Sequence, residues 1–118
     1  TDPKSFCEHS VFHDEFFGPF CILVSYENHR ELFACLEKLS GQLTGTVIGS
    51  SEDFKAFFPT LSLKCGRIIN NGVPTGVSVL PAMHHGGPFP SSTDSRFSAV
   101  GEASILRFTR YLSVQKTL

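Results

Sequence analysis

The order of short apolar runs and amphipathic stretches constrains the fold of this chain more than any other feature. Residues 20–26 form a continuous apolar run, which is typical of a strand buried on both faces. Residues 44–48 and 65–70 are two further runs of strand length. Stretches with apolar residues at helical spacing separate the three runs. The order strand, helix, strand, helix, strand predicts an α/β fold with a parallel sheet and crossover helices.

Capping signals position the two predicted helices. Asn28 and Glu31 form a capping-box pattern, and Gly41 predicts the end of the first helix. The second helix is expected from about Glu52, and Pro59 is expected to kink or end it. The predicted apolar stripes are Leu32, Leu36 and Leu39 in the first helix and Phe54, Phe57, Phe58 and Leu61 in the second.

The second half of the chain has a different texture. Residues 71–97 are rich in Gly, Pro and Ser but keep several apolar residues, so we expect a long, packed and functional loop. A third helix is predicted around Gly101, with Val100, Ala103 and Leu106 directed toward a core. Residues 111–118 alternate in polarity, which predicts an antiparallel or edge strand.

Length and composition exclude several classes of protein. The 118 residues allow one domain or a piece of one, and we expect a piece of a larger protein because the chain starts at Thr1 and its one methionine is Met83. The 12 Phe residues indicate apolar faces larger than a small domain covers alone. A net charge of −1 argues against nucleic-acid binding, and no apolar run has the roughly 20 residues of a membrane helix.

The cysteines indicate a reducing compartment. No two of the four have the C-x-x-C spacing of zinc or redox motifs, so we expect reduced cysteines with structural roles in a cytoplasmic protein. Cys21 and Cys35 are expected to be buried. Cys7, His9 and His13 could offer metal ligands, but no fourth ligand stands in register with them, so no metal site is predicted.

Three segments are candidates for ligand contact. In residues 15–19, EFFGP, Glu15 precedes a Gly-Pro turn and either accepts hydrogen bonds from ribose hydroxyls or is a solvated turn acid. Residues 70–77 follow a strand, where α/β sheets place ligands, although a packed corner explains them almost as well. His84 and His85 stand beside two glycines that allow close backbone approach, and the rings are either solvated or catalytic.

No convincing reaction centre appears by spacing alone. None of the cysteines lies in a recognisable nucleophile motif, and neither a G-x-S-x-G elbow nor a dinucleotide fingerprint is present. Taken together, however, the segments resemble the C-terminal part of the NAD(P)-dependent aldehyde dehydrogenases, from about Glu15 onward. Residues 15–19 resemble the family's E-x-F-G-P motif, residues 43–46 its G-L-T-G-T/S segment, and residues 66–72 its G-x-x-x-x-N strand. Residues 74–96 resemble the branch of bacterial fatty-aldehyde and α-ketoglutarate-semialdehyde dehydrogenases.

The resemblance implies roles for individual residues. Glu15 would bind the nicotinamide ribose of NAD or NADP, and Phe17 would pack near the nicotinamide. His85, more than His84, would lie near the catalytic thiol. The substrate funnel would include Asn71, Pro74, Thr75, Gly76 and Val77. Residues 111–118 would form an oligomerisation strand that joins a neighbouring subunit, so a homo-oligomer is expected.

The family's nucleophilic Cys, general-base Glu and nucleotide-binding fold all precede the E-x-F-G-P motif by more than this chain contains. We therefore expect residues 1–118 to be the C-terminal portion of the catalytic domain, whose parent oxidises an aldehyde by thiol attack and hydride transfer. The isolated chain is expected to be inactive. One alternative is a natural truncated relative with a binding or oligomerisation role, and another is an unrelated small α/β protein.

Overall fold

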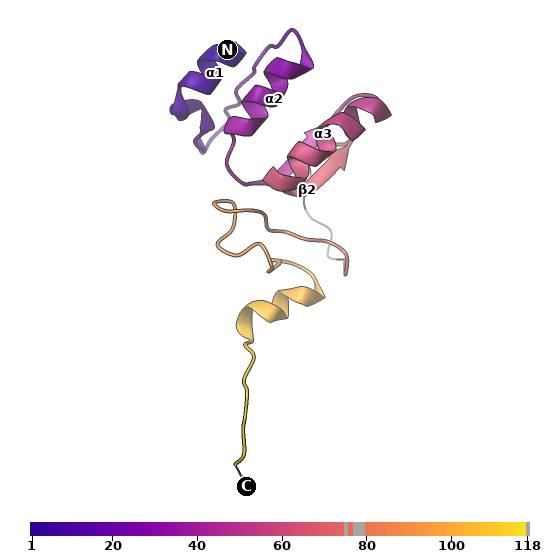
Figure 1. The fold of residues 1–118 in the computed structure, drawn as a ribbon. Helices are drawn as coiled ribbons and strands as arrows, with labels where there is room; N and C mark the ends of the chain where they lie inside the picture. The colour runs from indigo at the N-terminus through magenta and orange to yellow at the C-terminus, as the bar shows by residue number, and fades with distance from the viewer. Residues whose placement is uncertain (75, 77–79, 118) are drawn as a thin grey trace.

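The computed structural model describes residues 1–74, 76 and 80–117. Within these residues the chain is mixed α/β (Figure 1). Its elements in chain order are α1 (Pro3–Glu8), the 3₁₀ helix η1 (Ser10–His13), α2 (His29–Lys38), β1 (Gln42–Val47), α3 (Ser51–Lys64), β2 (Cys65–Asn70) and the 3₁₀ helix η2 (Glu102–Phe108).

Strands β1 and β2 form a parallel pair joined by α3. Gln42 lies opposite Cys65, and Val47 lies opposite Asn70. Val47, Phe57, Leu61 and Cys65 form the buried core, and apolar side chains of α2 pack against it. The two predicted strands at residues 44–48 and 65–70, and the crossover helix between them, are confirmed. The α/β fold class is therefore correct, with a smaller sheet than predicted.

Local capping explains where the helices begin. The Asn28 side chain accepts a hydrogen bond from the Glu31 amide at 3.1 Å. The Glu31 carboxylate in turn accepts a hydrogen bond from the amide of Glu27. A capping box requires the amide of the N-cap residue, Asn28, so the box is incomplete here. Helix α3 has the complete box, formed by Ser50 and Asp53. Helix α2 ends at Lys38, slightly before the predicted stop at Gly41.

Pro59 was expected to kink or end its helix, and it does not end it, because α3 continues through Pro59 to Lys64. Proline removes one backbone donor from a helix interior. Here Phe57 and Leu61 are buried on either side of it, so packing holds the helix across the missing bond. Both belong to the predicted stripe, whereas Phe58 is largely exposed.

The predicted strand at residues 20–26 is wrong. The segment has no strand partner in the described part of the chain, and its ties to the N-terminus are two hydrogen bonds. The Thr1 amino group donates to the Leu23 carbonyl at 2.7 Å, and the Ser25 amide donates to the Thr1 carbonyl at 3.1 Å. Leu23 is 78% exposed, and Cys21 is also exposed where burial was expected. An apolar run becomes a buried strand only when neighbouring strands pair with it.

The C-terminal elements also differ from expectation. The predicted third helix is the 3₁₀ helix η2, which buries none of its residues, because no apolar surface of the described chain covers it. Residues 111–117 form no strand, since they have no partner for a hydrogen-bonded ladder. Residue 118 lies outside the described residues. In Figure 1 this C-terminal segment extends away from the rest of the chain.

The accessible surface reflects these uncovered segments. It amounts to 9125 Å², whereas a compact protein of 13.0 kDa exposes about 6,300 Å². The radius of gyration is 18.0 Å, compared with about 13–14 Å for a compact chain of this length. The expectation of apolar faces larger than the chain itself covers is therefore correct.

Candidate functional site

Glu15 and Phe17 lie in an exposed turn after η1. Gly18 has φ +151°, a conformation that favours glycine, and the amide of Phe20 donates to the Gly18 carbonyl at 2.8 Å across Pro19. The predicted Gly-Pro turn is therefore present. The Phe17 side chain is fully exposed, and nothing in the described chain covers it.

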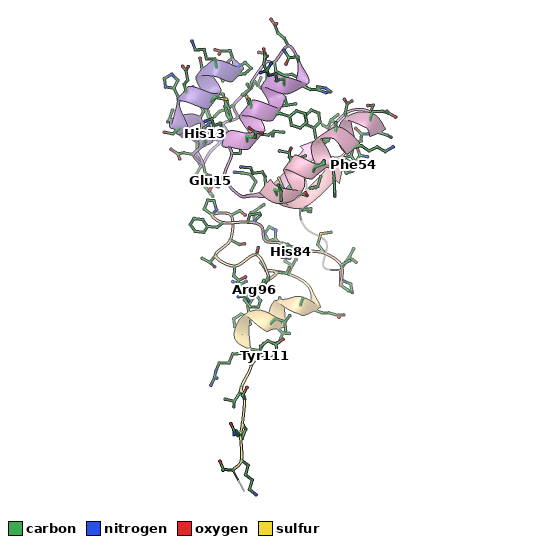
Figure 2. All side chains as sticks on the ribbon, viewed as in Figure 1. His13, Glu15, Phe54, His84, Arg96 and Tyr111 are labelled. Atoms are coloured by element: carbon green, nitrogen blue, oxygen red, sulfur yellow. The ribbon has the colours of Figure 1, made fainter. Side chains whose placement is uncertain are left out.

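Glu15 lines a cavity of about 630 Å³ between three segments of the chain. One wall comes from the η1 region, a second from residues 40–44 at the start of β1, and the third from Pro90 and Ser91 in the long loop. Figure 2 shows Glu15 at the boundary between the helical region and this loop. A carboxylate on the wall of a cavity of this size can accept hydrogen bonds from a hydroxylated ligand.

His85 lines a second cavity of about 480 Å³. Its wall includes Ser92, Asp94 and Arg107 as polar groups. Leu43 and Ser91 line both this cavity and the one that contains Glu15. The two cavities are therefore neighbours, and the fold brings Glu15 and His85 to the same region although 70 residues separate them in sequence.

Close backbone contact holds the His85 loop against the amino ends of the two strands. A Cβ atom at Gly66 would lie 1.6 Å from the Gly86 carbonyl oxygen, and one at Gly87 would lie 2.5 Å from the Gln42 carbonyl oxygen. The Gly41 amide also donates to the Phe89 carbonyl at 3.2 Å. The prediction that Gly86 and Gly87 permit close approach is confirmed.

A buried serine fixes the backbone at His85. The Ser98 hydroxyl accepts from the His85 amide at 3.1 Å and donates to the Val100 carbonyl at 2.7 Å. The Ala99 amide donates to the His85 carbonyl at 2.9 Å. Of the adjacent pair of histidines, His85 lines the cavity, whereas the His84 ring lies beside the backbone of Gly86.

The predicted funnel residue Asn71 lies at the opposite end of the strands. Asn71 follows the carboxyl end of β2 with φ 50°, and its side chain bonds both backbone groups of Gly49 at 2.9 and 3.0 Å. Pro74 and Gly76 are exposed, and neither lines the Glu15 or His85 cavity. Thr75 and Val77 lie outside the described residues. The funnel assignment stays a prediction. The Asn71 side chain itself links the carboxyl ends of the two strands.

Comparison with known proteins finds two similar dehydrogenases. No family model matches the chain. The chain is 45% identical over 106 residues to an alpha-ketoglutaric semialdehyde dehydrogenase of Acinetobacter baylyi, which covers 87% of this chain and 20% of that protein. It is 38% identical over 115 residues to alpha-ketoglutaric semialdehyde dehydrogenase 2 of Azospirillum brasilense, which covers 95% of this chain and 22% of that protein.

The chain is similar to one part of these aldehyde dehydrogenases. The resemblance inferred from the sequence motifs is thereby confirmed, including the branch, since both relatives carry the semialdehyde name. The chain spans about one fifth of the length of these curated relatives.

Sequence reasoning missed the charged groups in and next to the His85 cavity. Arg96 donates from Nε to Asp94 Oδ1 at 3.0 Å and from its guanidinium to Oδ2 at 2.6 Å. These hydrogen bonds lower the pKa of Asp94 to about 2. Arg107, from η2, is a second cationic residue and lines the His85 cavity. The Asp-x-Arg spacing could have indicated the ion pair, but no local signal connects Arg107 to His85.

Neither a metal centre nor a spanning helix is found in the described residues. No group of three or more His, Cys, Asp or Glu side chains there could hold a metal ion. His13 instead contacts the Phe6 carbonyl through Nε2 at 2.8 Å, and Cys7 contacts Cys35. A search of the described helices for one long and apolar enough to cross a membrane finds none.

Proposed function

We propose that this chain works as part of an enzyme that oxidises an aldehyde to a carboxylic acid with NAD or NADP. The observation that carries the proposal is the pair of adjoining cavities lined by Glu15 and His85, in a chain 45% identical to a protein named as a semialdehyde dehydrogenase. The chain supplies the wall that binds the nicotinamide ribose and part of the substrate funnel. The nucleophilic thiol belongs to the remainder of the enzyme.

The residues present fit the nicotinamide end of the cofactor. A carboxylate accepts hydrogen bonds from two adjacent ribose hydroxyls, and Glu15 lines a cavity of about 630 Å³. Phe17 presents an uncovered aromatic ring two residues away, suited to packing beside a flat heterocycle. When bound, the cofactor supplies the hydride acceptor. Glu15 and Phe17 orient it, and His85 lies on the substrate side.

The names of the relatives suggest the substrate class. A semialdehyde of α-ketoglutarate carries a carboxylate, and the exposed residue Arg107 lines the His85 cavity. We propose that the enzyme takes aldehydes of this kind. We further propose a homo-oligomer in which residues 111–118 join a neighbouring subunit, and a cytoplasmic location, which suits four free thiols.

The decisive experiment is Glu15→Gln in the full-length enzyme. Losing a charge-assisted contact of this kind costs about 1.5–3 kcal/mol, so cofactor affinity or the hydride-transfer rate should fall roughly tenfold to a hundredfold. Iodoacetamide labelling of the catalytic thiol should not change. Glu37→Gln, on the exposed face of α2, is the matched control and should behave like the wild type. Unaltered cofactor kinetics in Glu15→Gln would reduce Glu15 to a solvated turn residue.

The isolated 118-residue chain provides a second test. It should neither reduce NAD(P) with aldehydes nor bind the cofactor more tightly than about 1 mM, because the adenosine half has no partner in this proposal. Calorimetric titration and NAD(P)H fluorescence measure the two properties. Micromolar binding or steady turnover, in a preparation free of longer chains, would contradict the division of roles proposed above.

A further inference from the structure

Two cysteines from separate helices meet at the interface between α1 and α2. The Cys7 and Cys35 Sγ atoms lie 4.0 Å apart, as a thiol-thiol contact. The two positions are 28 residues apart in sequence, so the packing of the helices creates this pair rather than a local motif. All four thiols are free. We propose that Cys7 and Cys35 form a reversible disulfide when the protein meets hydrogen peroxide.

The two sulfur atoms start close to bonding distance. A disulfide has an S–S distance of about 2.05 Å, so the two sulfur atoms must approach by about 2 Å. The backbone around them is already packed, because Cys35 is 4% exposed and its thiol also reaches the Pro3 carbonyl at 3.9 Å. Helix α1 is therefore held in position against α2 before any oxidation takes place.

The two thiols differ in their access to solvent. Cys7 is half-buried and lines a surface cavity of about 410 Å³ formed by the first turn of α1 and by Glu31 and Ala34 of α2. Peroxide can reach Cys7 through this cavity. Burial, together with the neighbouring Cys7, raises the pKa of the Cys35 thiol to about 11. Cys35 therefore stays protonated and acts second, as the thiol that resolves the oxidised Cys7.

The reaction proceeds in two balanced steps. The Cys7 thiol loses its proton and the thiolate attacks one oxygen of hydrogen peroxide, so that the O–O bond breaks and a sulfenic acid forms. The leaving hydroxide takes up the released proton and becomes water. The Cys35 sulfur then attacks the sulfenic sulfur, loses its proton, and displaces a second water as the disulfide forms. Two thiols are oxidised by two electrons in total, and one peroxide is reduced to two waters. A dithiol reductant reverses the change.

The product joins the N-terminal helix to the core-bearing part of the chain. Helix α1 contributes Phe6 as its one buried apolar side chain. A covalent bond to α2 closes a loop in the unfolded chain and so favours the folded state. The oxidised chain should therefore unfold at a higher temperature than the reduced chain, and α1 should be protected from local opening.

The test is to oxidise the reduced 118-residue chain with one equivalent of peroxide, block the remaining thiols with N-ethylmaleimide, and cleave after glutamate. This cleavage separates the cysteines completely, with Cys7 in residues 1–8, Cys21 in 16–27, Cys35 in 32–37 and Cys65 in 53–102. Mass spectrometry should find residues 1–8 linked to 32–37. This link should form at least about tenfold faster than any link to the Cys21 fragment, because neighbouring groups react at high effective concentration.

Matched variants decide the assignment. Cys7→Ser should abolish the link, whereas Cys21→Ser, at an exposed thiol outside the pair, should leave its rate unchanged. In Cys35→Ser the sulfenic acid on Cys7 should accumulate and be trapped by dimedone. If that buried substitution unfolds the chain, Cys7→Ser with circular dichroism as a folding check is sufficient. A dominant link through Cys21 or Cys65, or peroxide consumption without a disulfide, would overturn the proposal.

Discussion

Different interactions stabilise residues 1–70 and residues 80–117. Among the residues that the structure describes, all six buried apolar side chains lie in the first region. They are Phe6, Cys35, Val47, Phe57, Leu61 and Cys65. In the second region the buried residues among those described are Gly86, Gly87 and Ser98, which bury backbone and a hydroxyl. The first region is held by hydrophobic packing, and the second by backbone contact with the first.

This difference explains where the candidate site lies. The Glu15 and His85 cavities occupy the seam between the two regions, where residues 40–44 meet the loop. Glycines make that seam close enough for the two cavities to share walls. A site at such a seam depends on both regions, so substitutions in either of them test the comparison.

The largest effect is expected in the packed region. Phe57 is buried between α2 and α3, with its ring centroid 4.8 Å from that of Phe33 and 5.0 Å from that of His29. Phe57→Ala should lower the free energy of unfolding by about 3–5 kcal/mol, because a cavity remains. Phe108→Ala, at an exposed ring in η2, should change it by less than about 0.5 kcal/mol. Urea denaturation followed by circular dichroism measures the free energy of unfolding of both variants. Equal losses in the two variants would show that the two regions do not differ in hydrophobic packing.

An intermediate effect is expected at the seam itself. In Gly66→Ala the new methyl would collide with the Gly86 carbonyl, so the loop must move. Overpacking of this kind costs about 1–3 kcal/mol. Gly76→Ala is the control, because nothing lies within 4 Å of a Cβ atom there. Hydrogen exchange of the Gly41 amide, which donates to the Phe89 carbonyl, should accelerate in Gly66→Ala and stay unchanged in the control. Unchanged exchange in both would mean that this contact does not hold the loop.

A smaller effect on stability is expected in the C-terminal segment. Tyr111, Leu112 and Val114 have large exposed side chains, and the unpaired backbone of this segment can pair with a second chain. Deleting residues 111–118 should leave the unfolding midpoint unchanged while reducing self-association, measured by light scattering. A wild-type chain that stays monomeric at high concentration would show that this segment does not drive association.

The sequence was informative where structure depends on near neighbours. The Asn28 cap, the β2 boundaries and the β1-α3-β2 order follow from local patterns, and the structure agrees with them. The strands expected at residues 20–26 and 111–118 require a partner strand, which no local pattern supplies. Pro59 does not end α3, and propensity alone could not show this because it ignores the burial of Phe57 and Leu61. Motifs identified Glu15 and His85 as site residues, but only the fold shows that their cavities adjoin, and neither Arg107 nor the Cys7–Cys35 contact has a local signal.

The smallest predicted effect concerns the ion pair of the second region. Asp94 and Arg96 are two residues apart, Asp94 is partly exposed and Arg96 is largely exposed, so their attraction is local and screened by solvent. Hydrogen bonds from Arg96 lower the pKa of Asp94 from its ordinary value of 3.8 to about 2. A lowered pKa means that the ionised carboxylate is favoured in the folded state. The contribution of the pair to stability is therefore fully present above about pH 4 and is lost as the pH falls toward 2.

The Arg96 amide reports on this titration, because it donates to Asp94 Oδ1 at 3.0 Å. Its NMR chemical shift should titrate with a midpoint near pH 2, and Asp94→Asn should remove that titration. The free energy of unfolding should change little with this substitution, because the pair lies outside the apolar core. A midpoint at the ordinary value of 3.8 would show that Arg96 does not hold the carboxylate in solution. A large loss of stability in Asp94→Asn would instead show that side-chain charges, as well as backbone contacts, hold the second region to the first.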